Sequence, residues 1–529
     1  MHKKYIPLLI GVALAIGFWM GGLFSFGNTK SLLSQSAKKQ KLNKLIDYIE
    51  YEYVDDVNTD SIVDVTVNRI LENLDPHSVY IPEKKLQEVT ESMNGGFVGI
   101  GVSFYMRKDT LSIIKTIEGG PSKKAGLQAG DKILMANKDT LFGKKLSNDE
   151  IIKALRGKIN SEVKLSIYRN SEDKQFIATI TRDIVPLKSV TVFCKVADSL
   201  GYIKINRFAE TTYKEFKKAL DELIKEGITS LVLDLRGNPG GFLDRANQIV
   251  DEFLEDGKLI LFTKNKKGNI EKFFATEKGS FEKGKIFVLI DEDSASASEI
   301  VAGALQDNDH GIIVGRRSFG KGLVQKEMQL GDGSAVRLTV SRYYTPTGRS
   351  IQKPYKNKTD RDYYNEYTKR YISGELTDST QIKVADSLRF TTPKGKVVYG
   401  GGGIIPDVFV PITASFEYDK VNYAINTPLI DNFIFDFLEK DRNYFKEVKV
   451  DSFCANYTVS DTLLENYKKH LKKRTRGELN ISNATKYHSE IKTALKAAIA
   501  AQLFNDNVAY SIKAIDDKML QKVKELLKK

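Results

Sequence analysis

Residues 285–325 read KIFVLIDEDSASASEIVAGALQDNDHGIIVGRRSFGKGLVQ. The first six are almost wholly apolar, which is typical of a strand that is buried on both faces of a sheet. Apolar residues then recur at helical spacing from residue 300 to 305, and residues 312–315 predict a second strand. This order of strand, helix and strand indicates an α/β core.

Three serines, Ser294, Ser296 and Ser298, fall where the first strand meets the helix. Only Ser296 stands three residues before a glutamate, in the capping-box spacing S-x-x-E that starts a helix. The unpaired N–H groups of a helix start favour an oxyanion, so a nucleophile is also plausible at this position. For an isolated S-x-x-E motif the helix cap is the commoner role, and the neighbouring residues have to decide.

Lys321 lies between two glycines, twenty-five positions after Ser296. If residues 323–330 are extended, Lys321 and Gln325 share one face, because side chains alternate with a period of two. Ser296 in the sequence SASASEI, Lys321 and Gln325 together resemble the catalytic set of the C-terminal processing, or tail-specific, serine proteases. The resemblance implies that Ser296 is a nucleophile, Lys321 its general base and Gln325 an orienting side chain.

The positions of the histidines disfavour a histidine-based triad. Between residues 185 and 411 the only histidine is His310, and a continuous helix of fourteen residues would place it about 21 Å from Ser296. The five histidines also form no HExxH or other metal spacing, so we expect neither a metal nor a cofactor. Lys321 would then have to be neutral, and burial lowers the pKa of a lysine toward the working pH.

A second glycine-rich turn, RGNPGG at residues 236–241, follows another apolar strand at residues 231–235. The resemblance implies that Gly240 supplies one N–H of an oxyanion hole and that Ala297 supplies the other. A tight turn of an α/β fold would explain the same glycines. The turn has neither the lysine of a phosphate loop nor a GxGxxG pattern, which excludes nucleotide binding.

The run PSKKAGLQAGDKIL at residues 121–134 resembles a PDZ domain, which captures a chain end by adding it as a strand to a sheet edge. Arg156, just past an expected helix at 149–155, is either a regulatory link between this groove and the protease core or a plain surface arginine. The resemblance implies a carboxylate-binding loop made of Phe97, Val98, Gly99, Ile100 and Gly101.

Residues 5–27 carry no charge and follow Lys3 and Lys4, which predicts a membrane span with its positive end in the cytoplasm. No small-x-small cleavage site closes the segment, which favours an uncleaved anchor over a removed signal peptide. We therefore expect a single-pass protein of the cell inner membrane, with its catalytic part in the periplasm or another extracytoplasmic space. The net charge of +13 is spread over lysine-rich helices without an aromatic-basic motif, so we expect no nucleic acid partner.

About fifty residues, 354–403, depart from the family pattern, and we interpret this insert as an exposed loop in preference to a lid or a partner surface.

The family often uses the helices before its PDZ domain to contact a second subunit, which implies a homodimer, and a regulatory adaptor is a further expected partner. The expected organisation is an anchor at 1–28, a helical region at 29–90, a PDZ domain at 91–180, a crotonase-like α/β protease core at 181–411 and a helical region at 412–529.

The sequence therefore predicts a membrane-anchored, PDZ-regulated serine endopeptidase that cleaves exported proteins near their C-termini through an acyl-enzyme. The alternatives are a non-proteolytic PDZ scaffold and an acyl-ligand-binding protein on a crotonase-like core. The set of Ser296, Lys321 and Gln325 argues against both, because neither alternative needs these side chains together.

Overall fold

The computed structural model describes residues 11–12, 37–356, 359–440, 445 and 447–528. Except for residues 11 and 12, the anchor expected at residues 5–27 lies outside these ranges. None of the helices within them combines the length and the apolar composition that crossing a membrane requires. The chain divides into two units, Met1–Asn73 and Leu74–Lys529. The first contains α2 (Ala37–Glu52) and α3 (Thr59–Glu72), whose first turn is capped by the Asn58 side chain.

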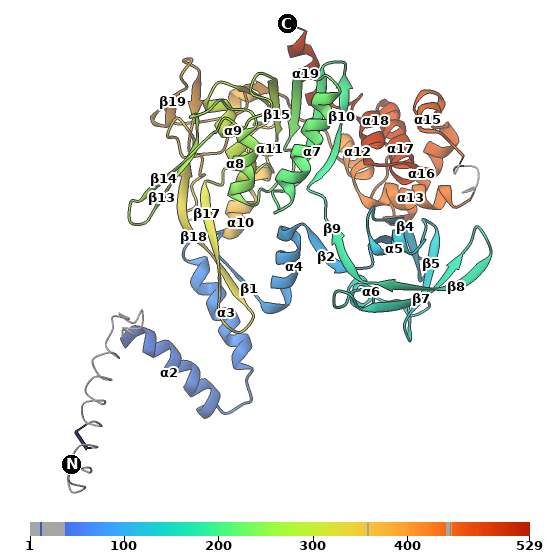
Figure 1. The fold of residues 1–529 in the computed structure, drawn as a ribbon, viewed down its shortest axis with the longest axis horizontal. Coiled ribbons are helices and arrows are strands. Elements are labelled where there is room, and N and C mark those ends of the chain that lie inside the picture. Colours follow the sequence, from blue (N-terminus) through green and yellow to red (C-terminus); the bar gives the residue numbers. More distant parts are fainter. Residues whose placement is uncertain (1–10, 13–36, 357–358, 441–444, 446, 529) are drawn as a thin grey trace, which may run out of the picture. The chain divides into compact units, whose positions relative to one another are not determined.

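The second unit contains a six-stranded sheet with strand order β10-β11-β12-β15-β16-β21. Figure 1 labels two of these strands, β10 and β15. All neighbouring strands from β11 onward are parallel, and only β10 runs antiparallel to its neighbour. The strands predicted from residues 285–325 are β15 and β16. The bounds are β10 (Val190–Ala197), β11 (Leu200–Ile205), β12 (Ser230–Asp234), β15 (Lys285–Ile290), β16 (Gly311–Gly315) and β21 (Val408–Phe409).

Helices cover both faces of this sheet, which explains the nearly continuous apolar sequence of β12 and β15. One face packs against α7 (Thr212–Lys225), α8 (Leu243–Asp251) and α9 (Ala297–Asp307), and the other packs against α19 (Lys518–Leu527). Because parallel strands all end at the same edge, the turns that follow β12 and β15 lie side by side. The predicted glycine turn and the predicted serine turn therefore meet there.

A second, smaller sheet carries the residues that follow Lys321. Two of its strands form a hairpin around residues 331–334, and β1 pairs with the second strand of that hairpin through Val79 and Arg337. This pairing brings the turn before β1 next to the lysine segment. The strands are β1 (Val79–Ile81), β13 (Leu259–Asn265), β14 (Ile270–Phe274), β17 (Leu323–Gln329) and β18 (Ala335–Tyr344).

The region expected to be a PDZ domain is a six-stranded antiparallel sheet around its own apolar core. Strand β3 is at the edge of this sheet, and α6 begins with a capping box between Ser147 and Glu150. A separate pair of strands, β2 (Gly96–Gly99) and β9 (Asp183–Pro186), flanks it. The elements of the sheet region are β3 (Val102–Arg107), β4 (Thr110–Thr116), α5 (Pro121–Lys124), β5 (Asp131–Ala136), β6 (Asp139–Thr140), α6 (Asn148–Leu155), β7 (Glu162–Arg169) and β8 (Lys174–Thr181).

The region after the core is helical, as predicted, and most of it packs around a separate apolar cluster. Its last helix, α19, instead belongs to the cluster on the face of the central sheet. The other helices are α12 (Phe416–Asn426), α13 (Pro428–Leu438), α15 (Val450–Asn456), α16 (Asp461–Arg474), α17 (His488–Leu503) and α18 (Asp506–Lys513).

The insert at residues 354–403 is not an exposed loop, so that interpretation is wrong. Tyr363, Leu376 and Val398 are buried, and so is Arg370, with 4% of its surface exposed. Its tyrosines and charged side chains are typical of a solvated segment, but several of them have partners on the protease core. The insert contains α10 (Asp360–Tyr364), α11 (Glu366–Ile372), the short 3-10 helices η2 (Ser379–Gln381) and η3 (Asp386–Leu388), and the strands β19 (Arg389–Thr391) and β20 (Val397–Tyr399).

Candidate active site

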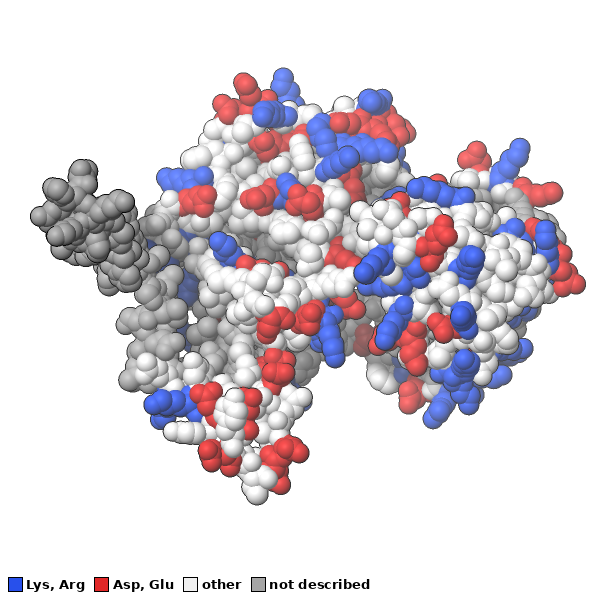
Figure 2. Space-filling view, turned by 60° about the horizontal axis from the view of Figure 1, so that its bottom comes forward, with Lys and Arg blue, Asp and Glu red and all other residues white. Residues whose placement is uncertain are grey.

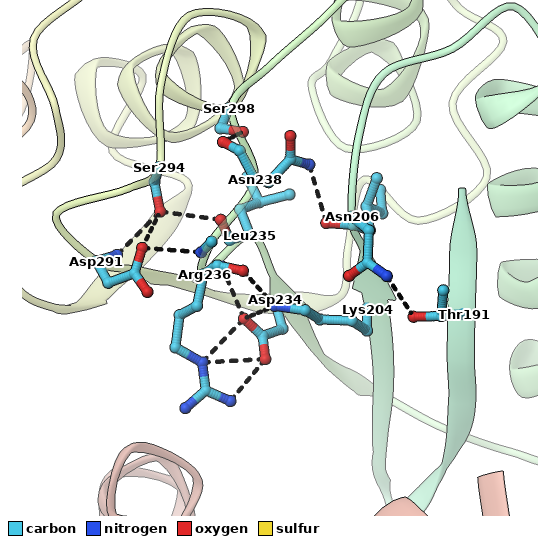
Figure 3. A network of polar contacts seen from close by, with 12 residues as sticks. Thr191, Lys204, Asn206, Asp234, Leu235, Arg236, Asn238, Asp291, Ser294 and Ser298 are labelled. Atoms are coloured by element: carbon cyan, nitrogen blue, oxygen red, sulfur yellow. Dashed lines mark hydrogen bonds and ion pairs between the residues drawn. The ribbon is translucent and has the colours of Figure 1, made fainter. Parts of the chain in front are cut away.

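The three serines of the turn before α9 have different environments. Ser294 Oγ donates to the carbonyl of Leu235 at 2.9 Å, and Ser298 Oγ donates to the carbonyl of Asn238 at 2.9 Å (Figure 3). Both serines are fully buried, whereas Ser296 is partly exposed. Ser294 and Ser298 therefore hold the serine turn against the turn that follows β12, and Ser296 is the serine that a substrate can reach.

Ser296 has a φ of 55°, in the left-handed region that residues other than glycine rarely adopt. Such strain persists only where the surrounding structure enforces it, and it is concentrated at functional sites. Here the turn is held by Ser294 and Ser298 on one side and by the start of α9 on the other. The strained turn directs attention to Ser296, as the capping-box motif does.

Glu299 connects the serine turn to the lysine loop. Its carboxylate has no exposed surface, and it accepts the N–H of Ser296 at 2.9 Å and the N–H of Lys321 at 2.8 Å. It also accepts the N–H of Gly320 at 2.7 Å and the hydroxyl of Ser318 at 2.6 Å. Burial raises the pKa of Glu299, although these four donors oppose the rise. The sequence motif predicted the bond to Ser296 but not the three bonds to the lysine loop.

Tyr343, on β18, makes a second connection between the same two residues. Its hydroxyl lies 3.2 Å from the carbonyl oxygen of Ser296 and 3.0 Å from that of Lys321, and it donates to both. Burial raises the pKa of Tyr343 well above its ordinary value, so the hydroxyl keeps its proton. Sequence reasoning missed this residue, because a tyrosine in a strand carries no signal beyond its contribution to the core.

Lys321 and Gln325 point into the same space, as predicted. Lys321 Nζ donates to Gln325 Oε1 at 2.8 Å, and Gln325 Nε2 donates to the backbone carbonyl of His77. Burial lowers the pKa of Lys321 to about 8; Arg337 lowers it as well, while Glu299 and Asp75 oppose the change. At pH 8 roughly half of the molecules therefore have a neutral lysine, which can accept a proton.

His77 comes from the turn before β1 and is buried beside this pair. Its Nε2 lies 2.9 Å from the hydroxyl of Tyr363, and its pKa is lowered to about 3 by burial and then by the nearby Lys321. It is neutral at working pH, and its backbone carbonyl fixes Gln325. The same turn is tied to β18, because Asp75 and Ser78 both accept hydrogen bonds from Thr339.

The predicted oxyanion turn lies against the serine turn. A Cβ atom on Gly240, whose φ is +100°, would come within 2.7 Å of Ser296 Cβ and 2.9 Å of the Ala297 nitrogen. Only glycine fits this approach. Ala297 is the first residue of α9, where the helix itself leaves the N–H without a partner. The N–H of Gly240, in contrast, donates to Asn238 Oδ1 at 2.9 Å, so it is engaged in this structure.

Asn238, which sequence reasoning did not select, organises the turn after β12. It is fully buried, its Nδ2 donates to the carbonyl of Ile205 at 2.9 Å, and its own carbonyl accepts the Ala295 N–H at 3.0 Å. It thereby joins β11, the glycine turn and the serine turn. Its place in the RGNPGG turn was the one available signal.

An ion-pair network fixes the start of the same turn. Arg236 pairs with Asp234 at 2.6 Å and with Asp517 at 2.7 Å, and Lys204 pairs with Asp234 at 3.2 Å. Burial opposes ionisation of Asp234, but Arg236 and Lys204 outweigh this effect and lower its pKa. Asp517 also caps the first turn of α19, so the network joins the glycine turn to the C-terminal helical region.

Of the five residues predicted to form the carboxylate-binding loop, Phe97, Val98 and Gly99 lie in β2, and only Ile100 and Gly101 lie between β2 and β3. Phe97 and Val98 pair with β9, while Gly101 has a φ of +75°, which favours glycine. Arg156 follows α6, forms an ion pair with Glu91 on α4 (Glu83–Asn94) at 3.1 Å, and its guanidinium lies 5.0 Å from the centre of the Phe97 ring. Arg156 thus links the end of α6 to the loop and to the helix that precedes it.

Figure 2 shows basic and acidic side chains interspersed over the described part of one face of the molecule. Within the described ranges, no three histidine, cysteine, aspartate or glutamate side chains gather in a way that could hold a metal ion.

Comparison with protein families gives three matches. Residues 199–363 match peptidase family S41, residues 98–180 match the PDZ domain, and residues 421–505 match a family of unknown function.

Curated relatives cover most of the chain. A carboxy-terminal-processing protease of Bartonella bacilliformis is 33% identical over 66% of this chain and 81% of its own length. The carboxy-terminal processing protease CtpA of Bacillus subtilis is 33% identical over 71% of this chain and 81% of its own length. Among solved structures, a photosystem II D1 C-terminal processing protease is 25% identical, covers 70% of this chain and 86% of its own, and aligns with a TM-score of 0.37.

Proposed function

The chain belongs to peptidase family S41 and is a serine-type carboxy-terminal processing protease with a PDZ domain, and from this premise we propose that Ser296 is its nucleophile and Lys321 its general base. The observation that carries the proposal is the double connection between these residues. Glu299 accepts both of their N–H groups, and Tyr343 donates to both of their carbonyls. A scaffold without catalysis gives no reason for this arrangement and is not favoured.

The proposed reaction begins when neutral Lys321 takes the proton of Ser296 Oγ, which attacks the carbonyl carbon of the substrate's peptide bond. The tetrahedral intermediate then loses its amine, which receives the proton from the Lys321 ammonium, and an ester on Ser296 remains. Water, deprotonated by Lys321, attacks this ester, and the serine recovers its proton as the new C-terminus leaves. Gln325 orients Nζ through its Oε1 without adding a charge.

The oxyanion of the intermediate is proposed to lie at the N–H of Ala297, at the start of α9. Gly240 supplies the second donor once its N–H leaves Asn238 Oδ1. Two preorganised donors can stabilise such a transition state by several kcal/mol. The close approach of Gly240 to Ser296 and Ala297 supports this assignment.

The PDZ domain binds protein or peptide C-termini as substrate. We propose that the peptide adds to the free edge of β3 beside α6, with its carboxylate at the amides of Phe97, Val98, Gly99, Ile100 and Gly101. Arg156 is the proposed regulatory link, because it contacts both Phe97 in this loop and Glu91 on the preceding helix.

The deciding experiment incubates the full-length chain, purified in detergent, with an unfolded protein and with a serine-reactive fluorophosphonate. The proposal expects cleavage near substrate C-termini and covalent labelling at Ser296. Ser296→Ala should lose both, whereas Ser511→Ala, which removes an exposed serine on α18, should keep both. Labelling at another serine, or turnover by folded Ser296→Ala, would reject the assignment.

We also propose that residues 5–27 form an uncleaved anchor in the inner membrane with the catalytic part in the periplasm, supported by the lack of charge and by the preceding lysines. Fractionation with protease accessibility tests this, and a shortened soluble form would favour a signal peptide.

A crotonase-like core is supported by the parallel sheet with helices on both faces. The domain limits, the homodimer and the adaptor stay predictions.

A further inference from the structure

The insert at residues 354–403 contacts the loop that carries Lys321. Arg370 Nη1 donates to the carbonyl of Arg317 at 2.9 Å, and its Nη2 donates to the carbonyl of Ser318 at 3.0 Å. Glu375 binds the side chain of Arg317 with both oxygens, each at 2.7 Å. The insert therefore holds the backbone and a side chain of the loop three and four residues before the lysine.

Arg370 is itself fixed within the insert. Glu366 accepts from its Nε at 3.1 Å and from its Nη2 at 3.0 Å, and Glu366 also pairs with Lys353 at 2.7 Å. Lys353 Nζ lies 3.6 Å from the centre of the Phe319 ring and 4.3 Å from that of Tyr363. Phe319 is two residues before Lys321, so Lys353, which is paired with Glu366 of the insert, also contacts the lysine loop.

The same loop is also bound by Glu299, which accepts from Ser318, Gly320 and Lys321. Ser318 is fully buried, and a buried backbone carbonyl needs a donor. Arg370 supplies that donor with a planar fork that reaches two carbonyls at once, which a lysine cannot reproduce. The loop is thus held between a carboxylate of the core and a guanidinium of the insert.

We propose that the insert positions the general base, with Arg370 as the positioning residue that keeps the loop before Lys321 pressed against Glu299. This inference rests on the proposed role of Lys321. It assigns a function to a segment that departs from the family pattern, and it explains why Arg370 and Glu375 of the insert are buried.

The depth of the loop controls how much water reaches Lys321. Burial is the main reason that its pKa lies near 8 and not near the ordinary 10.5. If Arg370 is lost, the carbonyls of Arg317 and Ser318 turn to water, the loop moves outward and the pKa of Lys321 rises. A rise of one pKa unit would lower the neutral fraction at pH 8 about fivefold and would have little effect well above pH 10.

The test measures kcat and KM of the full-length protein between pH 6 and pH 10.5 for Arg370→Ala, Arg370→Lys and the matched control Arg389→Ala, which removes an exposed arginine of the insert. For Arg370→Ala we expect kcat at pH 8 to fall roughly fivefold or more, KM to stay within about twofold, and the acid limb of the profile to move to higher pH. Arg370→Lys should recover part of the shift, because it reaches one carbonyl, and Arg389→Ala should match the wild type.

Two results would overturn the proposal: an unchanged kcat in Arg370→Ala, or a loss that is equal at all pH values with no movement of the acid limb. Thermal unfolding is recorded in parallel, and if Arg370→Ala does not fold, Arg370→Lys alone must show the shift for the proposal to stand. Failure of the proposed function gives a different result, because Lys321→Ala would then retain turnover whatever the Arg370 variants do.

Discussion

Replacing Glu299 by glutamine tests the connection between the nucleophile and the base. In the structure one carboxylate oxygen accepts the N–H groups of Ser296 and Lys321, and the other accepts from Ser318 and Gly320. A glutamine amide has the same shape but only one accepting oxygen, so its NH₂ group must face two donors. One of the two pairs of bonds is therefore lost in a fully buried site.

The magnitude follows from the number of donors left without a partner. Each unsatisfied buried donor costs about 1–3 kcal/mol, so Glu299→Gln should lower the free energy of local opening of the serine turn and the lysine loop by roughly 2–6 kcal/mol. At the lower limit, amide exchange in the serine turn and the lysine loop should become about thirtyfold faster. Turnover should fall as well, and the fall should persist at pH 10.5, because the distance between Ser296 and Lys321 has changed.

The assay is hydrogen exchange by mass spectrometry on peptides that span the two segments, together with kcat at pH 8 and pH 10.5. Glu277→Gln, at an exposed position of the same core, is the matched control and should behave as the wild type. If Glu299→Gln exchanges at the wild-type rate and keeps its turnover, the carboxylate does not hold the two segments together and the reasoning is wrong.

Three further predictions concern the residues around the reaction. Ser296→Ala and Lys321→Ala should each abolish turnover in a folded protein, and activity retained in either variant would contradict the roles of nucleophile and general base. The kcat of the wild type should rise with pH through about 8, because Lys321 loses its proton there. Gln325→Ala should lower kcat less than Lys321→Ala, because it orients Nζ and carries no proton, and equal losses in steady-state assays would show otherwise. If the PDZ domain only tethers the substrate, Gly99→Pro should raise KM for substrates with a free C-terminal tail and leave KM for C-terminally amidated reporters unchanged. If the PDZ domain also switches the protease on, a free peptide with an apolar C-terminus should raise kcat for a separate reporter in the wild type and not in Gly99→Pro.

Residues 285–325 were sufficient to predict β15, α9 and β16, because the two strands are short apolar runs of a buried sheet and the helix has apolar residues at helical spacing. The same residues placed Ser296 at the start of α9 and brought Lys321 to Gln325. The period-two argument for that pair was less complete, since β17 starts only at Leu323 and its register shifts between Val324 and Gln325.

Other features could not be predicted, for physical reasons. Tyr343 acts through backbone carbonyls, which no side-chain pattern reveals. The N–H of Gly240 donates to Asn238 Oδ1, and this hydrogen bond depends on the backbone conformation of the turn. The burial of the insert was not predictable, because the composition of the insert is typical of a solvated loop. Its Arg370 donates hydrogen bonds to backbone carbonyls more than fifty residues away, which no local pattern indicates. In each case a polar group has a distant backbone partner, which becomes visible only in three dimensions.

The ion pair between Arg236 and Asp517 has a consequence for how the enzyme is made. Translation proceeds from the N-terminus, so Ser296, Lys321 and the glycine turn are all synthesised well before α19. Until residues 517–527 leave the ribosome, Val232, Phe287 and Leu289 on the sheet lack the cover of Met519, Leu520 and Val523, and Arg236 has no second carboxylate to hold it. The nascent chain therefore carries its complete catalytic set on an unfinished sheet.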